Sequence, residues 1–335
     1  MTTTSHSEIQ SALSEIARQF SDTRIQYCQI EIDRFDGRIC ALSGSVLDMT
    51  TLDVVGAALN DRFHDIAFDA SAVRILRQAQ PRWLTVVTNV TSVNARPGLT
   101  AERMSQVMGG WRVELLQEEG SWAFVRQEDG YLGWVYRGHL SDASGPELTH
   151  VVSIPISVLR SRPAEDSPLT GRMTAGEKVA VRAQEEGWGQ VNGGWLPMAH
   201  LRPLDAPLAD EDARLQMVTD AVRFLGVPYL WGGCTGFGID CSGFARLLHQ
   251  LSGLALPRDA DMQFRAGRSV EPPFRPGDLL FFGGKGEGRA ITHVGMSLGG
   301  WRMIHASVSR NGVYIDDVQA VEHLRKSFAG ARAFV

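Results

Sequence analysis

The sequence has few cysteines, and their placement argues against a disulfide-stapled fold. There are four in 335 residues, at positions 28, 40, 234 and 241, whereas disulfide frameworks belong to short, cysteine-dense chains. If Cys28 and Cys40 lie on two strands joined by a turn at Asp36-Gly37, they do not face each other across the hairpin, so we expect no bridge between them. Free cysteines at this frequency agree with a reducing compartment.

The sequence also lacks the segments that direct a chain into or across a membrane. Its first twenty residues contain no basic stretch followed by an apolar one, and no later stretch reaches the roughly 20 apolar residues that span a bilayer. We therefore expect a cytoplasmic protein. The net charge of -5 provides no positive surface for nucleic acid or an anionic membrane, so neither is expected as a partner.

The length predicts two to four domains, and the first 80 residues are typical of a small α+β domain. The pattern predicts, in order, a helix over 8–20, strands over 25–33 and 38–47, a helix over 50–63 and an apolar end at Val73–Leu76. The segment Ala41–Leu47, followed by a helix, faintly resembles the small phospholipid-associated BON domain.

Two stretches of the chain then repeat each other, over residues 83–142 and 150–204. Ser92–Pro97 aligns with Ser157–Pro163, Gly133-Trp-Val135 aligns with Gly194-Trp-Leu196, and the copies end at His139-Leu140 and His200-Leu201. Short strands with glycine turns at this spacing predict two small β-barrels. Both repeats resemble the bacterial SH3-like domain.

Residues 210–335 predict a second α+β domain, after a linker over 203–212. The helix that opens it is expected to place its apolar residues on one face, and short apolar runs separated by glycines predict an antiparallel sheet behind it. Those helix residues are Leu215, Val218, Val222 and Leu225, and the runs are 278–282, 293–298, 301–306 and 313–316.

Cys241 has the sequence surroundings of a nucleophile. A glycine-rich approach leads to it, Asp240 is a good helix N-cap, and Gly253 is a good helix stop. A thiol at a helix start feels the positive end of the helix dipole, so we expect thiolate to be favoured at neutral pH. The neutral alternative is a small buried hydrophobe, which also describes Cys234 on the same approach.

Two histidines can supply the base and its orienting partner. If Leu298-Gly-Gly300 forms a three-residue hairpin loop with Gly300 left-handed, His293 faces His305 directly across one face of the sheet. A two-residue turn would place them on opposite faces. Zinc is the alternative for these histidines with Cys234 and Cys241, but the C-x6-C and H-x11-H spacings fit a structural site poorly, so we expect no metal and no cofactor.

The motifs of residues 210–335 together resemble the NlpC-type, papain-like cell-wall cysteine peptidases. They are Pro228–Gly233, Asp240-Cys-Ser-Gly-Phe244, Leu256–Asp259, Pro276–Leu279, His293-Val-Gly295 and Ile304–Ser307, in that order. With two SH3-like domains ahead, the chain is similar to the γ-D-glutamyl-L-diamino-acid endopeptidases of peptidoglycan turnover. The resemblance implies that Cys241 attacks a γ-D-glutamyl carbonyl, that His293 acts as base and acid, and that His305 orients it.

The resemblance also implies how substrate is held. The Cys241 N–H and the Tyr229 hydroxyl would form the oxyanion hole, although Tyr229 can instead be a core aromatic. Asp240 would bind the free amine of an N-terminal L-Ala as well as cap the helix. The remaining implied pocket residues are Trp231, Ser242, Arg258 and Asp259, the last two being otherwise a surface ion pair, and Tyr131, otherwise a barrel-core residue.

The predicted activity is hydrolysis of L-Ala-γ-D-Glu-diamino-acid peptides, with meso-diaminopimelate or Lys as diamino acid, in murein recycling. Arg96 lies where an acid would help to bind an ammonium, and its positive charge departs from that pattern. Two alternatives stay open: a non-catalytic module that binds peptidoglycan or a protein, and an acyl- or peptidyl-transferase in which an amine resolves the thioester. The preferred diamino acid, the oligomeric state and the role of residues 1–80 are not specified by the sequence.

Overall fold

The computed structural model describes residues 4–143, 145–205, 210–284 and 290–335. The chain divides into two compact units, of which the first contains residues 1–83 and 114–133 and the second contains residues 84–113 and 134–335. Helices and sheets are largely segregated along the sequence, so the fold is α+β, as predicted.

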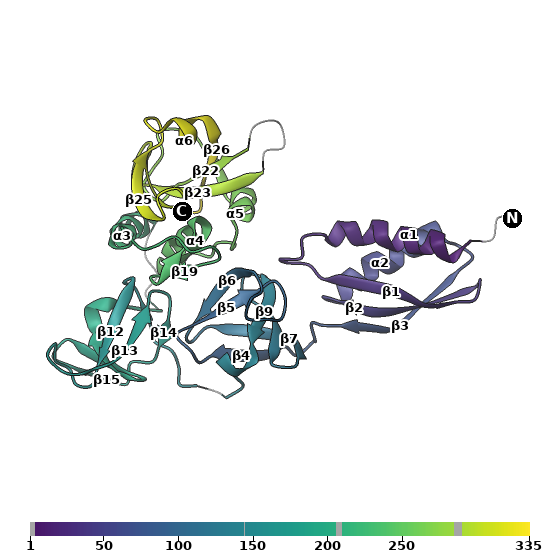
Figure 1. Cartoon of the computed structure of the whole chain (residues 1–335), viewed down its shortest axis with the longest axis horizontal. Coiled ribbons are helices and arrows are strands. Elements are labelled where there is room, and N and C mark those ends of the chain that lie inside the picture. The colour runs from purple at the N-terminus through teal and green to yellow at the C-terminus, as the bar shows by residue number, and fades with distance from the viewer. Residues whose placement is uncertain (1–3, 144, 206–209, 285–289) are drawn as a thin grey trace. The chain divides into compact units, whose positions relative to one another are not determined.

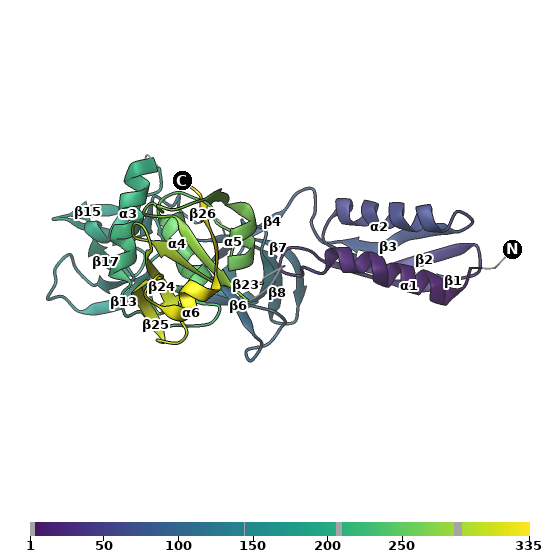
Figure 2. The ribbon, with the colours of Figure 1, turned by 90° about the horizontal axis from the view of Figure 1, so that it is seen from above.

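The N-terminal part of the first unit is a sheet with two helices on one face (Figures 1 and 2). The sheet order is β1-β2-β3, with β1 and β2 antiparallel and β2 and β3 parallel. Every predicted helix and strand is present, but the apolar end at Val73–Leu76 proves to be mostly the last part of a strand. The elements are α1 (His6–Ala17), a 3-10 turn (Arg18–Phe20), β1 (Cys28–Phe35), β2 (Ile39–Val46), α2 (Met49–Arg62) and β3 (Ala67–Ile75).

Local signals explain these helices and the cysteine placement. Ser5 and Glu8 form a capping box that starts α1, and Asp48 caps α2 by accepting from Thr51. Cys28 lies opposite Val46, and Cys40 lies opposite Phe35, so the two thiols do not face each other, as predicted. All four cysteines of the chain are free.

Short strands follow, and the two repeats end in the same way. Each copy closes with a 3-10 turn before its last strand, Arg137–His139 in the first and Met198–His200 in the second. His139 Nδ1 lies 2.8 Å from the Thr91 hydroxyl, and His200 Nδ1 lies 2.9 Å from the Ser157 hydroxyl. The repeated His-Leu pair therefore ties the end of each copy to an early strand of that copy.

The strands of the first repeat are β4 (Arg82–Val86), β5 (Val90–Asn94), β6 (Arg103–Met108), β7 (Arg112–Glu119), β8 (Trp122–Arg126), β9 (Leu132–Tyr136) and β10 (Leu140–Ser141). Those of the second are β11 (His150–Val152), β12 (Ile156–Arg160), β13 (Leu169–Thr174), β14 (Lys178–Val179), β15 (Ala183–Glu185), β16 (Trp188–Val191), β17 (Gly194–Pro197) and β18 (Leu201–Pro203).

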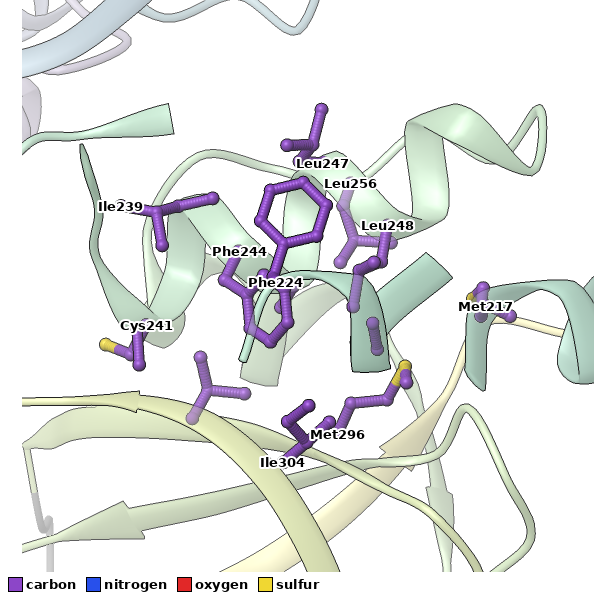
Figure 3. Packing of buried hydrophobic residues seen from close by; sticks show 14 of the residues in the cluster. Met217, Phe224, Ile239, Cys241, Phe244, Leu247, Leu248, Leu256, Met296 and Ile304 are labelled. Carbon is purple, nitrogen blue, oxygen red and sulfur yellow. The ribbon is translucent and has the colours of Figure 1, made fainter. Parts of the chain in front are cut away.

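The C-terminal part of the second unit packs helices against an antiparallel sheet of order β21-β26-β22-β23-β24-β25. The apolar side chains of the helix at Cys241–Leu251 meet those of the central strands in one core (Figure 3). The elements are α3 (Asp210–Arg223), β19 (Cys234–Thr235), β20 (Gly238–Ile239), α4 (Cys241–Leu251), α5 (Ala260–Ala266), β21 (Arg268–Val270), β22 (Leu279–Gly283), β23 (Ile291–Ser297), β24 (Arg302–Ser307), β25 (Gly312–Asp317), α6 (Glu322–Ser327) and β26 (Phe328–Ala333).

The buried face of α3 is only partly the predicted one, because Val218 alone of the four predicted residues packs against the core. Leu215, Val222 and Leu225 are exposed, whereas Met217 and Ala221 are fully buried. The reason is that α3 also buries two charged residues, each in an ion pair with a distant residue. Arg214 contacts Asp278 at 3.0 Å, and Asp220 contacts Arg202 at 2.8 Å. An apolar periodicity cannot reveal a face that is completed by paired charges.

None of the helices in the described part of the chain has the length and apolar character of a membrane-spanning segment.

Candidate active site

Helix α4 places Cys241 at its first residue, as predicted. Asp240 has an extended backbone, and its carboxylate accepts a 2.7 Å hydrogen bond from the Gly243 N–H, which starts the helix. The thiol side chain of Cys241 is 8% exposed. Figure 3 shows it at the edge of the core, with Phe224 and Phe244 in the middle. The helix therefore holds a nearly buried thiol against the sheet.

The expected preference for thiolate at this helix start is wrong for the unliganded protein. Burial raises the pKa of Cys241 to about 12, and the negative charge of Asp240 adds to the increase. The Val294 N–H and the Arg258 guanidinium act in the opposite direction without reversing it. Desolvation outweighs the helix dipole, so the resting thiol is neutral at pH 7.

The two histidines lie on one face of neighbouring strands, but they are not directly opposite. Met296 pairs with Ile304 and Ser297 pairs with Met303, which places His305 opposite Gly295 and makes His293 its diagonal neighbour. The loop has an odd length, as predicted, and Gly300 is left-handed with φ +59°, but the loop is centred on Gly300. A Cβ at Gly295 would clash with the Met303 sulfur and come within 2.9 Å of the His305 Cβ, so glycine there allows the strands to approach each other closely.

The rings of His293 and His305 are joined by a short hydrogen bond. His293 Nε2 lies 2.7 Å from His305 Nδ1, so His293 Nδ1 takes no part in the bond between the rings. Burial and, to a smaller extent, the neighbouring His305 lower the pKa of His293 to about 3. Burial also lowers the pKa of His305, against an opposing effect of Asp316. Both imidazoles are therefore neutral at pH 7, and each can donate through one nitrogen and accept through the other.

The hydrogen-bond chain continues to Asp316, which the sequence analysis did not select. His305 Nε2 lies 2.9 Å from Asp316 Oδ2, and Arg310 donates to Asp316 Oδ1 at 2.7 Å. Asp316 lies in β25, two residues beyond Tyr314, the residue opposite His305. The sequence shows only that a carboxylate lies near the end of the strand that follows His305. The pairing of the two strands is needed to single out Asp316 as the partner of His305.

Asp240 and Arg258 form a buried ion pair behind the nucleophile. Their oxygen and nitrogen atoms approach to 2.6 Å, and the two side chains are 9% and 1% exposed. Arg258 also donates to the Ser242 hydroxyl at 2.9 Å and to the Ser105 hydroxyl at 3.0 Å. The alternative of an Arg258–Asp259 ion pair is confirmed only as a contact of 3.9 Å, and it is not on the surface, because the Arg258 side chain is 1% exposed.

This network occupies the Asp240 carboxylate. It accepts from the Gly232 and Gly243 N–H groups, the Ser242 hydroxyl and both terminal nitrogens of Arg258. A carboxylate offers about four acceptor positions, so an ammonium could bind Asp240 only if one of these donors gave way. An acidic residue that sequence reasoning missed, Glu102, is exposed and accepts from Trp231 Nε1 at 3.1 Å.

The other predicted site residues differ in their placement. Tyr229 is partly buried and lies close enough to Cys241 for their charges to interact, and burial raises its pKa, so it is a neutral phenol. Trp231 is 64% exposed. Tyr131 is 2% exposed and belongs to the first unit, and its burial favours the alternative of a barrel-core residue. The part of the chain that the structure describes contains no group of side chains placed to hold a metal ion.

The chain is similar to proteins of one known family. Residues 226–332 match the NlpC/P60 family, and residues 94–140 match the bacterial dipeptidyl-peptidase Sh3 domain. A gamma-D-glutamyl-L-lysine dipeptidyl-peptidase of Bacillus subtilis (strain 168) is 31% identical over 251 residues, which cover 70% of this chain and 81% of that protein. A protein of the same name from Bacillus cereus (strain ATCC 10987 / NRS 248) is 28% identical over 260 residues, or 69% and 75% of the two chains.

The fold is similar to that of a solved structure from the same family. The crystal structure of an NlpC/P60 family protein from Bacillus cereus ATCC 10987 superposes with a TM-score of 0.64 at 21% identity, covering 75% of this chain and 99% of that chain. The match over residues 226–332 and the 31% identity along most of a curated relative identify the family of the chain. The protein therefore belongs to the NlpC/P60 family of cysteine peptidases.

Proposed function

We propose that the protein hydrolyses the γ-D-glutamyl-L-diamino-acid bond of peptidoglycan stem peptides. The observation that carries this proposal is the hydrogen-bonded pair of His293 in β23 and His305 in β24, the two strands that pack against helix α4. The names of the two Bacillus relatives, both gamma-D-glutamyl-L-lysine dipeptidyl-peptidases, support the choice of bond. Their likeness extends over about 70% of this chain, beyond the catalytic part.

The proposed reaction begins from the neutral pair. His293 Nδ1 takes the thiol proton as Cys241 Sγ attacks the γ-carbonyl, and the carbonyl oxygen becomes an oxyanion. The Cys241 N–H, which no carbonyl of its own helix reaches, and the neutral Tyr229 phenol donate to that oxyanion.

The intermediate then collapses to a thioester. The bond to the diamino-acid nitrogen breaks, and the proton held by His293 goes to the departing amine. In the second half, His293 takes a proton from water as the water oxygen attacks the thioester carbonyl. The carboxylic acid leaves, and the thiol is restored by the same proton.

We propose further that the preferred substrate is a free peptide with an unblocked N-terminal L-Ala. Glu102 is the acid that we assign to the ammonium, since it is exposed beside Trp231, whereas the oxygens of Asp240 are already in use. Trp231, Ser242 and Asp259 would line the remaining pocket. Glu102→Gln should raise KM for the free peptide and leave KM for the N-acetylated peptide unchanged. Equal KM values for Glu102→Gln and wild type would remove Glu102 from this role.

The experiment that tests the function incubates the protein with L-Ala-γ-D-Glu-L-Lys, L-Ala-γ-D-Glu-meso-diaminopimelate, their N-acetylated forms and intact sacculi. Products are separated and weighed by liquid chromatography and mass spectrometry. Cys241→Ala should abolish cleavage, whereas Cys234→Ala, the matched change at a buried cysteine seven residues earlier, should keep it. No cleavage by wild type, or cleavage by Cys241→Ala, would reject the hydrolase. A product carrying an added amine would assign a transferase.

We also propose that the enzyme acts in the cytoplasm on peptides released in murein recycling. The support is the set of four free cysteines, which a reducing compartment preserves. A preference for free peptides over sacculi in the assay above, together with recovery of the protein in the cytoplasmic fraction of its host, would agree with this location. Efficient cleavage of sacculi would contradict it.

The division into domains 1–80, 83–142, 150–204 and 210–335 is likewise a proposal. It is supported by the separate core formed around α1, α2 and the β1–β3 sheet, and by the core formed by the second repeat. Limited proteolysis should cut first near residues 80, 145 and 207. Early cuts inside one of the four ranges would require new boundaries.

A further inference from the structure

Asp316 stands at the end of a chain of hydrogen bonds that leads to the reacting atoms. From the nucleophile side, His293 Nε2 meets His305 Nδ1 at 2.7 Å, and His305 Nε2 meets Asp316 Oδ2 at 2.9 Å. The Asp316 side chain is 16% exposed and the His305 side chain is 3% exposed, so water competes little for the inner bonds. The order of atoms along this chain determines where each hydrogen must be.

Arg310 holds the outer end of the chain. Its Nη1 donates to Asp316 Oδ1 at 2.7 Å, and its guanidinium carbon lies 4.1 Å from the centre of the Tyr314 ring. A guanidinium has donors only, so the bond between Arg310 and Asp316 has one direction. It fixes Asp316 with Oδ1 toward Arg310 and Oδ2 toward His305.

The inner bonds then follow in sequence. A carboxylate oxygen accepts, so His305 Nε2 must carry its hydrogen, and the Nδ1 of a neutral His305 must be the acceptor. The hydrogen of the bond between the two rings therefore belongs to His293 Nε2. A neutral His293 with hydrogen on Nε2 has its lone pair on Nδ1, which is the nitrogen left for the thiol.

We infer that Asp316 is a positioning residue that sets the tautomers of both histidines and thereby makes His293 a base. This inference rests on the proposed function, in which His293 accepts the thiol proton. The reverse tautomers would satisfy the bond between the rings equally well, with hydrogen on His305 Nδ1. They would then leave hydrogen on His293 Nδ1, facing the thiol that it has to deprotonate. Asp316 excludes this inactive arrangement.

Asp316→Asn is a sharp test because Arg310 dictates how the amide turns. The amide oxygen has to face the donor-only guanidinium, so the amide NH2 faces His305 Nε2 and donates to it. His305 Nε2 then becomes an acceptor, and the hydrogens along the chain reverse. We expect kcat to fall by about 10²- to 10⁴-fold with KM little changed, since a wrong tautomer in a comparable triad lowers kcat by about 10⁴.

A second variant separates this effect from simple damage to the fold. In Asp316→Asn combined with Arg310→Met, no guanidinium holds the amide oxygen, and the amide can turn to accept from His305 Nε2. The double variant should regain at least about tenfold in kcat over Asp316→Asn, the worth of one hydrogen bond in the reaction barrier. Arg310→Met alone leaves a carboxylate that can only accept from His305 Nε2, so it should lose much less kcat than Asp316→Asn. A merely structural Asp316 predicts that the double variant is worse than either single one.

The tautomers can be read directly, without any peptide substrate. In protein labelled with ¹⁵N-histidine, long-range proton–nitrogen spectra distinguish the two nitrogens of each neutral ring, and His293→Gln and His305→Gln variants assign the signals. Wild type should carry hydrogen on Nε2 of both rings, and Asp316→Asn should carry it on Nδ1 of both. Asp317→Asn is the matched control, because its carboxylate accepts from the Gln319 N–H on the exposed side of β25.

The outcomes are distinct. Reversed tautomers with a large loss of kcat in Asp316→Asn, and recovery in the double variant, support the inference. Unchanged tautomers, a kcat within about threefold of wild type, or a double variant less active than Asp316→Asn would overturn it. If wild type cleaves no γ-glutamyl peptide while the tautomers reverse as expected, the proposed function fails and the assignment of the proton chain stands on the spectra.

Discussion

Removing the cation from the buried pair behind the nucleophile should destabilise the catalytic part of the chain by an amount that depends on pH. Arg258→Met keeps most of the side-chain volume but leaves the Asp240 carboxylate buried without its charge partner at 2.6 Å. Breaking such a pair from one side costs about 3–5 kcal/mol. This loss of stability has an upper limit, because the unpaired Asp240 carboxylate can take up a proton instead of staying charged.

Protonating an ordinary aspartic acid costs about 4 kcal/mol at pH 7 and about 1.5 kcal/mol at pH 5. The charge penalty of Arg258→Met should therefore shrink by more than half as the pH falls from 7 to 5. In the folded variant the pKa of Asp240 would be raised above its value in the unfolded chain. The loss of stability is therefore complete at high pH and disappears as the pH falls toward the pKa of the unfolded chain.

Cysteine labelling measures this penalty in the right part of the chain. Cys234 is 3% exposed and sits beside the Arg258 network, so its alkylation across a urea series, read by peptide mass spectrometry and normalised to the unfolded chain, reports local unfolding. Arg265→Met is the matched control, since that arginine is 60% exposed in its pair with Asp261 and should cost less than about 0.5 kcal/mol. Equal losses for the two variants at pH 7, or a penalty for Arg258→Met that does not shrink at pH 5, would refute the reasoning.

Three further predictions follow from burial and close approach. His293 must be neutral to act as base, and burial lowers its pKa to about 3, so kcat/KM should stay level from pH 7 to pH 5; a loss centred near pH 6.5 would contradict this. Burial raises the pKa of Glu177 to about 7. Its contribution to the free energy of unfolding is therefore present below about pH 4.5 and is lost as the pH rises through 7, by up to about 3 kcal/mol. Glu177→Gln should remove this dependence of the unfolding free energy on pH, measured by urea unfolding. Gly295→Ala should push the strands apart at Met303 and His305 and lower kcat by about 10²-fold, whereas Gly284→Ala, which meets no atom of the described residues within 4 Å, should not.

Features with a local cause could be predicted from the sequence. Helix α4 begins and ends as expected because its N-cap and its left-handed Gly253 are neighbours of the helix itself. The common face of His293 and His305 was also predictable, since an odd hairpin loop preserves the alternation of side chains along paired strands.

Features set by contacts between residues distant in the sequence could not be predicted. The hairpin loop is centred one residue later than expected because the Gly300 N–H donates to the Phe274 carbonyl at 2.8 Å and Trp301 packs on the Phe274 ring. Phe274 lies outside the hairpin, and no local pattern announces it. The same holds for Asp316, whose role becomes visible only when β25 pairs with β24.

Cys241 lies between helix α4 and the sheet, and the two sides affect its ionisation differently. On the helix side, Asp240 starts α4 but opposes a negative charge on the thiol, and Arg258 offsets only part of that effect. On the sheet side, His293 is neutral and linked through His305 to a carboxylate. In the proposed reaction, the thiolate of Cys241 forms only when His293 removes the proton as the carbonyl arrives. The tautomer of His293 would then decide whether the nucleophile forms. A buried, neutral thiol is also a poor target for stray oxidants, so the same arrangement that demands an exact tautomer protects the cysteine between turnovers.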